Sequence, residues 1–294
     1  MYLSNLLQSL YSDLGQTPKN YGQFKATGGS ATTFYNTAWG ELESPPETDA
    51  FKNMLAFVVR DAGGVNASPE GKWGRISAYA DSTYMGTMAT VTDAIAADDE
   101  MMIVSQDKFP LQEVIFRVNR ALQNLGTIAI RNTSLTTDSS TVAYTVPLAL
   151  KAYPPIMIQY GDDDNGWETI SSWSFEPTSS GSMGRLILPA LPSGYTIAYF
   201  YNGLHPNVNA YNSVIEEAIH PKVATAAAII EVLSWYNRLG ENQGGNDFFL
   251  WLEGEYRDKH LPMAKAENPI WKPKHAPRYS TFVDYSVNKY ITNG

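Results

Sequence analysis

Residues 110–126 read PLQEVIFRVNRALQNLG, and this stretch decides how the rest of the chain is interpreted. Pro110 suits the first turn of a helix, where its missing N–H costs nothing, and Gly126 suits a helix end. One face of the resulting helix is apolar and consists of Leu111, Val114, Ile115, Val118, Ala121, Leu122 and Leu125. The spacing therefore predicts an amphipathic helix over residues 109–126.

Three further segments favour helix, over residues 1–14, 220–240 and 245–266. The segment 1–14 has leucines at helical spacing. The segment 220–240 is apolar nearly all round, which predicts that it lies at the centre of the bundle. No single one of these helices can bury its own apolar face. We therefore expect the four to form a bundle.

Two long stretches between the helices favour strands instead, because short β-branched and aromatic runs alternate there with turn residues. The Asn165-Gly166 pair is typical of a hairpin. The expected strands lie near residues 56–59, 75–79, 87–91, 101–104, 143–146, 156–160, 168–170, 185–188 and 195–201.

The expected fold class is α+β, a four-helix bundle carrying two inserted β-rich modules, each a small barrel or sandwich. The bundle would consist of residues 1–20, 105–126 and 205–267, the modules of residues 21–104 and 127–204, and an extended C-terminal arm of residues 268–294.

Composition narrows the possible functions. The 294 residues are 44% hydrophobic and 17% charged, with a net charge of −9. A net negative charge argues against nonspecific binding to a phosphate backbone. The absence of cysteine excludes disulfides, Cys-ligated zinc and thiol nucleophiles. No basic, apolar leader is recognised at the start, and the most apolar stretch, residues 223–236, is too short to span a bilayer.

The arm differs from the rest of the chain in charge. Its four Lys and Arg residues outweigh Asp284 by three, which leaves −12 on residues 1–267. Prolines at positions 269, 273 and 277 favour an extended conformation. Aromatic anchors beside basic groups predict docking onto an acidic partner surface. The candidate partner-binding residues are Trp271, Lys272, Lys274, Arg278, Tyr279, Phe282 and Tyr285.

Motifs for chemistry are weak in this sequence. The four histidines are scattered and form no metal-binding pair, and Gly71-Lys72 lacks the glycine and hydroxyl residue that a phosphate loop needs. The run 162–166 (DDDNG) resembles a cation loop but lacks its later bidentate glutamate, so an acidic hairpin tip is expected. Residues 98–100 (DDE) are expected to be a solvated turn. We predict no catalytic, cofactor-binding or metal-ligating residue, and no cofactor.

The chain resembles the head-to-tail adaptor (connector) proteins of tailed bacteriophages. The resemblance rests on the four helical segments and on three phrases, FPLQE at 109–113, NTSLTT at 132–137 and HPKVA at 220–224. It implies a structural, non-enzymatic virion protein assembled in the host cytoplasm. Such adaptors form rings, commonly dodecameric, that dock under the portal protein and join the capsid to tail or neck proteins.

The same resemblance implies that neighbouring adaptor subunits contact one another, that genomic DNA passes through the ring without sequence-specific binding, and that no membrane is involved. The C-terminal arm would grip the portal. Two alternatives remain open. One is a different virion component, such as a tail, neck or baseplate protein with sugar- or protein-binding β modules. The other is a cell-wall-degrading hydrolase, which needs a concave site with convergent polar groups.

Overall fold

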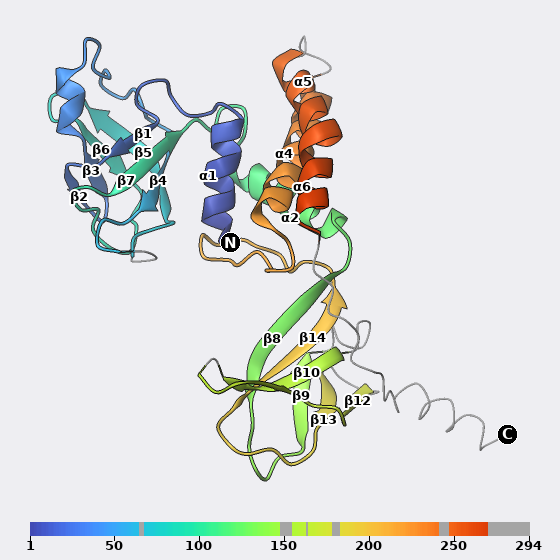
Figure 1. Ribbon diagram of the computed structural model, residues 1–294. Coiled ribbons are helices and arrows are strands. Elements are labelled where there is room, and N and C mark those ends of the chain that lie inside the picture. The colour runs from blue at the N-terminus through green and yellow to red at the C-terminus, as the bar shows by residue number, and fades with distance from the viewer. Residues whose placement is uncertain (65–67, 148–154, 163, 178–182, 241–246, 270–294) are drawn as a thin grey trace. The chain divides into compact units, whose positions relative to one another are not determined.

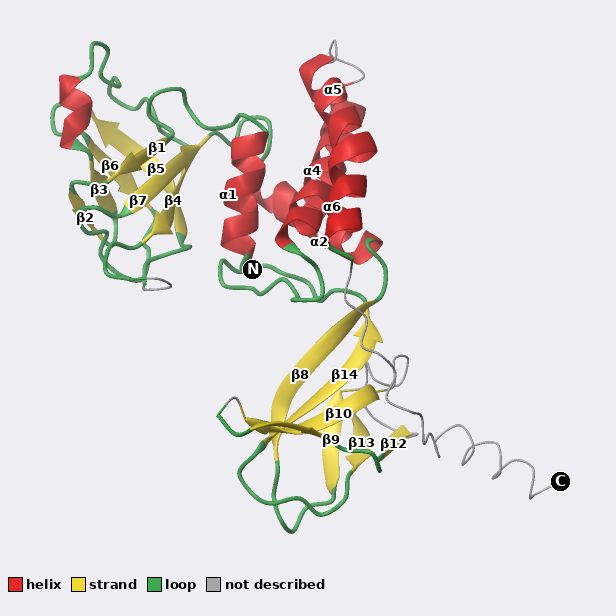
Figure 2. Ribbon diagram, in the orientation of Figure 1, coloured by secondary structure: helices red, strands yellow, loops and turns green. Residues whose placement is uncertain are grey.

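The computed structural model describes residues 1–64, 68–147, 155–162, 164–177, 183–240 and 247–269. The chain divides into two compact units (Figure 1), one comprising Met1–Leu125 and Pro206–Pro269 and the other built on Gly126–His205. Within the described residues, all of the helices belong to the first unit, and strands occur in both (Figure 2).

The helices of the first unit gather around α4. The elements are α1 (Leu3–Asp13), α2 (Leu111–Asn124), α4 (Pro221–Gly240), α5 (Asp247–Glu255) and α6 (Leu261–Glu267), with a π-helical turn, η2 (Tyr256–His260), joining α5 to α6. Helix α4 contacts α1, α2, α5, η2 and α6. The predicted helical segments are therefore confirmed, and so is the central place of the most apolar one.

Local chemistry explains where these helices begin and end. Gly15 and Gly126 follow α1 and α2 with φ values of 65° and 91°, a left-handed conformation that a glycine adopts without steric cost. Before α4, the His220 Nδ1 atom accepts a hydrogen bond from the Lys222 amide at 3.3 Å. This bond satisfies one amide that the first turn leaves without a helical partner.

The other part of the first unit is a seven-stranded antiparallel sheet. Its strands in spatial order are β1 (Gln23–Lys25), β7 (Glu100–Val104), β4 (Leu55–Arg60), β5 (Trp73–Ala80), β6 (Met85–Met88), β3 (Thr33–Tyr35) and β2 (Gly28–Ser30). The two edge strands, β1 and β2, are consecutive in the chain. Between them, Ala26 pairs with Asp99 and Thr27 donates to the Tyr35 carbonyl, so one segment bridges both edges and the sheet closes on itself.

Aromatic side chains fill the interior of this closed sheet. Trp39, on the 3-10 helix η1 (Thr37–Glu41), is 3% exposed and lies against Phe24, Phe51 and Tyr79, with ring centroids 4.7, 5.2 and 5.8 Å away. Such large rings supply most of the apolar area that a small closed sheet can bury.

Helix α1 connects the closed sheet to the other helices. The α1 helix contacts both β4 and α4. Tyr11 is buried on α1, its ring lies 6.2 Å from that of Phe57, and its hydroxyl donates to the Phe109 carbonyl at 2.8 Å. The closed sheet and the helices thus share one compact unit.

The second unit is a sandwich of two antiparallel sheets. Four strands lie in the order β11 (Gly166–Thr169), β10 (Pro155–Asp162), β14 (Thr196–Gly203) and β8 (Ile128–Thr136), and three in the order β12 (Ser174–Pro177), β13 (Met183–Ile187) and β9 (Ala143–Pro147). Ile158 and Ile197 from the larger sheet share a core with Phe175 and Leu186 from the smaller. The predicted hairpin is confirmed, because Asp162 pairs with Gly166 across the β10–β11 turn.

The predicted fold class is wrong. The protein is mainly β, with three antiparallel sheets holding fourteen strands in the described residues, and it is not a four-helix bundle carrying inserted modules. The physical reason lies at α1, which packs on a strand on one side and on α4 on the other. A helix shared in this way belongs to a mixed core, so the closed sheet is a structural part of the helical unit.

Candidate docking surface

A buried polar cluster attaches α5 to α4. Glu253 is buried, with 9% of the residue exposed, and its carboxylate accepts hydrogen bonds from the Ser234 hydroxyl and the Asn237 amide, each at 2.6 Å. Arg257 forms an ion pair with the same carboxylate and also donates to the Ser234 hydroxyl at 3.0 Å. Because buried polar groups are stable only when paired, this cluster fixes which side of α5 faces α4.

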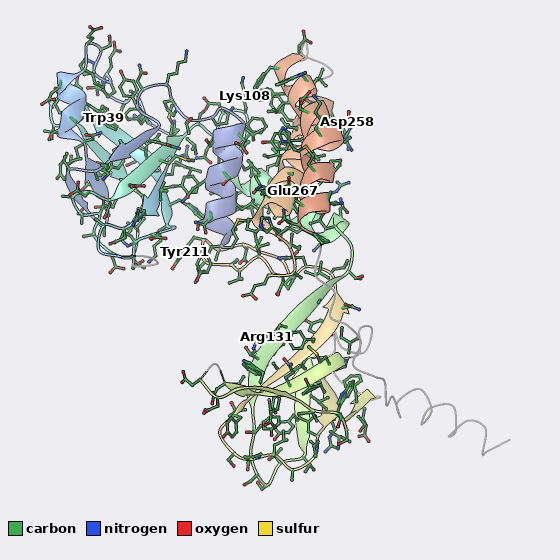
Figure 3. All side chains as sticks on the ribbon, viewed as in Figure 1. Trp39, Lys108, Arg131, Tyr211, Asp258 and Glu267 are labelled. Carbon is green, nitrogen blue, oxygen red and sulfur yellow. The ribbon has the colours of Figure 1, made fainter. Side chains whose placement is uncertain are left out.

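An aromatic cluster completes the α4–α5 contact. The Phe249 ring lies 5.2 Å from that of Tyr236 and 5.4 Å from that of Phe109, measured between centroids. The Lys108 ammonium, labelled in Figure 3, lies 5.2 Å from the Phe249 centroid. Phe249 and Leu252 are buried on this side of the helix.

The opposite side of α5 is apolar and exposed. Its residues Phe248, Leu250 and Trp251, which we call the α5 outer face, are 49%, 52% and 58% exposed. The rings of Phe248 and Trp251 are 6.1 Å apart and form one surface. A helix that is apolar on both sides is normally buried on both sides. The α5 outer face is therefore the strongest candidate for a protein-docking surface in the described residues.

A second exposed aromatic group lies on α2. Phe116 is 57% exposed, on the side of α2 away from its buried residues. The Arg117 guanidinium lies between two rings, 5.0 Å from the Phe116 centroid and 5.5 Å from that of Trp235 on α4. Phe116, Arg117 and Trp235 form what we call the α2 outer face. It has the Trp and Arg composition typical of interface anchors.

A groove of about 610 Å³, lined by both polar and apolar residues, runs between α1, the start of α4, and the η2–α6 segment. Tyr256 lines it, donating a 3.0 Å hydrogen bond to Asp13, and its ring lies 4.6 Å from that of His260. Burial, and then the Asp13 carboxylate, raise the pKa of Tyr256 above its usual range. Lys222 and Glu267 form an ion pair across the same groove at 3.6 Å. The two carboxylates of the groove thus have separate partners, Asp13 with Tyr256 and Glu267 with Lys222.

The residues predicted from sequence to bind a partner lie outside the described residues. They are Trp271, Lys272, Lys274, Arg278, Tyr279, Phe282 and Tyr285, and the same holds for the whole predicted contact of the arm. The α5 outer face was missed as a site. Its signal is the run FFLWL at 248–252, which is apolar at successive positions where a one-sided helix needs alternation.

The acidic clusters have structural roles. The Asp162 carboxylate accepts hydrogen bonds from the backbone amides of Asp164 and Asn165, as a hairpin turn requires. The prediction of a solvated turn at residues 98–100 is wrong for Asp99, which is fully buried and accepts from the amides of Ala62 and Ala96. Within the described ranges, no group of three or more His, Asp or Glu side chains is placed to hold a metal ion.

No protein-family model matches the chain, and no curated protein matches it in sequence. Among the described residues, no helix has the length and apolar character that crossing a membrane demands.

Proposed function

We propose that this chain is a structural virion protein of a tailed bacteriophage, a head-to-tail adaptor that forms a ring beneath the portal. One structural observation carries the proposal. Helix α5 is fixed to α4 by Glu253 and Phe249 on its inner side and exposes apolar residues on its outer side. A rigid helix whose outer side exposes apolar residues such as Leu250 and Trp251 is what a subunit of a permanent assembly presents before it assembles.

The roles of the buried polar groups agree with a structural protein. Asp99 holds two loops through backbone amides, and Glu253 joins two helices. His220 helps to begin α4. In each case the side chain is used to hold backbone or a neighbouring element in place, and stability is what such contacts supply.

The proposed partners are those of an adaptor: the portal protein above, tail or neck proteins below, and neighbouring copies in a ring, which we expect to be dodecameric. The ring would assemble in the host cytoplasm and remain in the virion. Genomic DNA would pass through its channel without sequence-specific contacts. With a net charge of −9, we expect an acidic or neutral channel wall, because a basic wall would retain DNA by its phosphates.

The proposal is tested by purifying the full chain alone and with the portal protein of the same phage. Native mass spectrometry and negative-stain images should show closed rings, either of the chain alone or on the portal. A chain that stays monomeric at high micromolar concentration, and that does not bind the portal, would refute the proposal.

A further inference from the structure

We infer that two copies of this chain contact each other head to tail, with the α5 outer face of one copy packed on the α2 outer face of the next. The inference rests on the proposed ring and names the surfaces that close it. It begins from Leu250 and Trp251, which are exposed on a helix whose other side is already buried. Burying them requires an apolar partner surface.

The two outer faces are carried on different sides of α4. Glu231 and Trp235, one turn apart on α4, face α2, where Glu231 pairs with Arg120 at 3.0 Å. Ser234 and Asn237 face α5. With 3.6 residues per turn, these two pairs of positions point in different directions from the axis of α4. Helices α2 and α5 thus pack on different sides of α4, and each exposes an aromatic residue on the side away from its own buried residues.

This arrangement is the one that a head-to-tail contact requires. A two-fold dimer uses one patch twice, whereas a ring uses two different patches on the same subunit. Here both patches lie in one compact unit. Each contains exposed aromatic side chains, Trp251 on one and Phe116 on the other, of the type that dominates interfaces.

Charges at the edges fit the same pairing. Asp247 and Asp258 lie one turn before and two turns after Trp251, and neither forms an ion pair within the described part of the chain. Asp258 is labelled in Figure 3. Beside the α2 outer face, the Arg120 side chain is 49% exposed. Arg120 pairs with Glu231 through its Nε atom, and the other N–H donors of its half-exposed guanidinium are the groups that the acidic edge of the next copy would meet.

Crosslinking tests the contact directly, because the natural chain contains no cysteine. Gly254 follows Trp251 on α5, and a side chain added there meets no atom within 4 Å. Gln112 is exposed on α2, one turn before Phe116. We would introduce Gln112→Cys and Gly254→Cys, singly and together, and treat each assembled protein with a short bismaleimide.

The double variant should give a ladder of crosslinked species up to the full ring, and a mixture of the two single variants should give only dimers. Either single variant alone should give none. Crosslinking of Gly254→Cys with itself would indicate a two-fold α5 contact and overturn the inference. If mass spectrometry shows rings but no crosslink forms between positions 112 and 254, the inferred contact is wrong and the proposed ring stands. If no rings form, both the inferred contact and the proposed ring are refuted.

A matched pair of substitutions separates docking from folding. Trp251→Asp should raise the protein concentration at which half of the chains form rings by at least tenfold. Its circular dichroism spectrum should be unchanged. Val214→Asp, at another exposed apolar position, should assemble normally. Equal assembly of the two variants would contradict the inference.

Discussion

Replacing Glu253 with alanine should weaken the attachment of α5 to α4. The carboxylate is the acceptor shared by Ser234, Asn237 and Arg257. Its removal leaves three donors behind, of which Ser234 is buried, and the free-energy cost comes from the buried donors more than from the lost negative charge.

The magnitude follows from how buried each donor is. Ser234 is 7% exposed, although it keeps its contact with Arg257, and Asn237 is half-buried. A buried donor left without an acceptor costs about 1–3 kcal/mol. The Arg257 side chain is 56% exposed, so water can hydrate it after the change. We therefore expect Glu253→Ala to destabilise the α4–α5 contact by about 2–3 kcal/mol.

The assay must report on α5 itself. A chain with two compact units need not unfold in one transition, so the midpoint of global unfolding is a poor measure of the stability of the α4–α5 contact. Hydrogen exchange of the α5 amides reports local opening. A loss of 2–3 kcal/mol should lower their protection by about 30- to 150-fold, since about 1.4 kcal/mol corresponds to a factor of ten.

Glu255→Ala is the matched control on the same helix. Glu255 pairs with Lys259 at 2.7 Å, four residues away, and the lysine side chain is 64% exposed. Such surface pairs contribute about 0.5 kcal/mol or less. If Glu253→Ala and Glu255→Ala reduce α5 protection equally, the buried cluster does not hold the helix and the reasoning fails.

Three further predictions concern other parts of the chain. Asp99→Ala should destabilise the closed sheet by about 2–4 kcal/mol, because the amides of Ala62 and Ala96 lose their acceptor. Hydrogen exchange of the sheet amides measures this, and a loss of protection equivalent to less than about 0.5 kcal/mol would contradict it. Burial raises the pKa of Tyr79 to about 12. The stability contributed by its neutral form is therefore present below pH 10 and lost as the pH rises through 12. Tyr79→Phe should reduce the loss of stability in that pH window and leave stability at pH 7 unchanged or higher, since the described residues offer the Tyr79 hydroxyl no hydrogen-bond partner. Deleting residues 268–294 should leave both units folded by circular dichroism but abolish attachment to portal-containing heads, and normal attachment would refute the proposed role of the arm.

The helices were predictable because they are long and periodic. In α2, the buried Val114, Val118 and Leu122 recur at the spacing that the pattern requires, and the left-handed Gly126 follows the helix. Strands of the expected length, such as β4 and β5, were also found. Strands β1, β2 and β3 were missed because each spans three residues, too short to show alternation.

Strand β8 was missed for a different reason. It is nine residues long, but its second half reads NTSLT and is half-buried or exposed, so alternation is absent there. Its pairing with β14 over seven positions comes from a strand about 65 residues away. Likewise, the sequence does not show that α1 lies between strand β4 and helix α4. Leucines at helical spacing predict that one face of the helix is buried, but they do not indicate which element buries it.

The α5 helix shows how a pattern can be recognised and its meaning missed. Residues 248–252, FFLWL, fit a bundle helix if only Phe249 and Leu252 are counted, and these two are indeed buried against the rest of the unit. The remaining three cannot reach the same side, since successive residues on a helix point about 100° apart. Five consecutive apolar residues therefore require two surfaces to cover them. The described residues supply one from α4 and its neighbours, and in the proposed ring the second comes from a neighbouring copy.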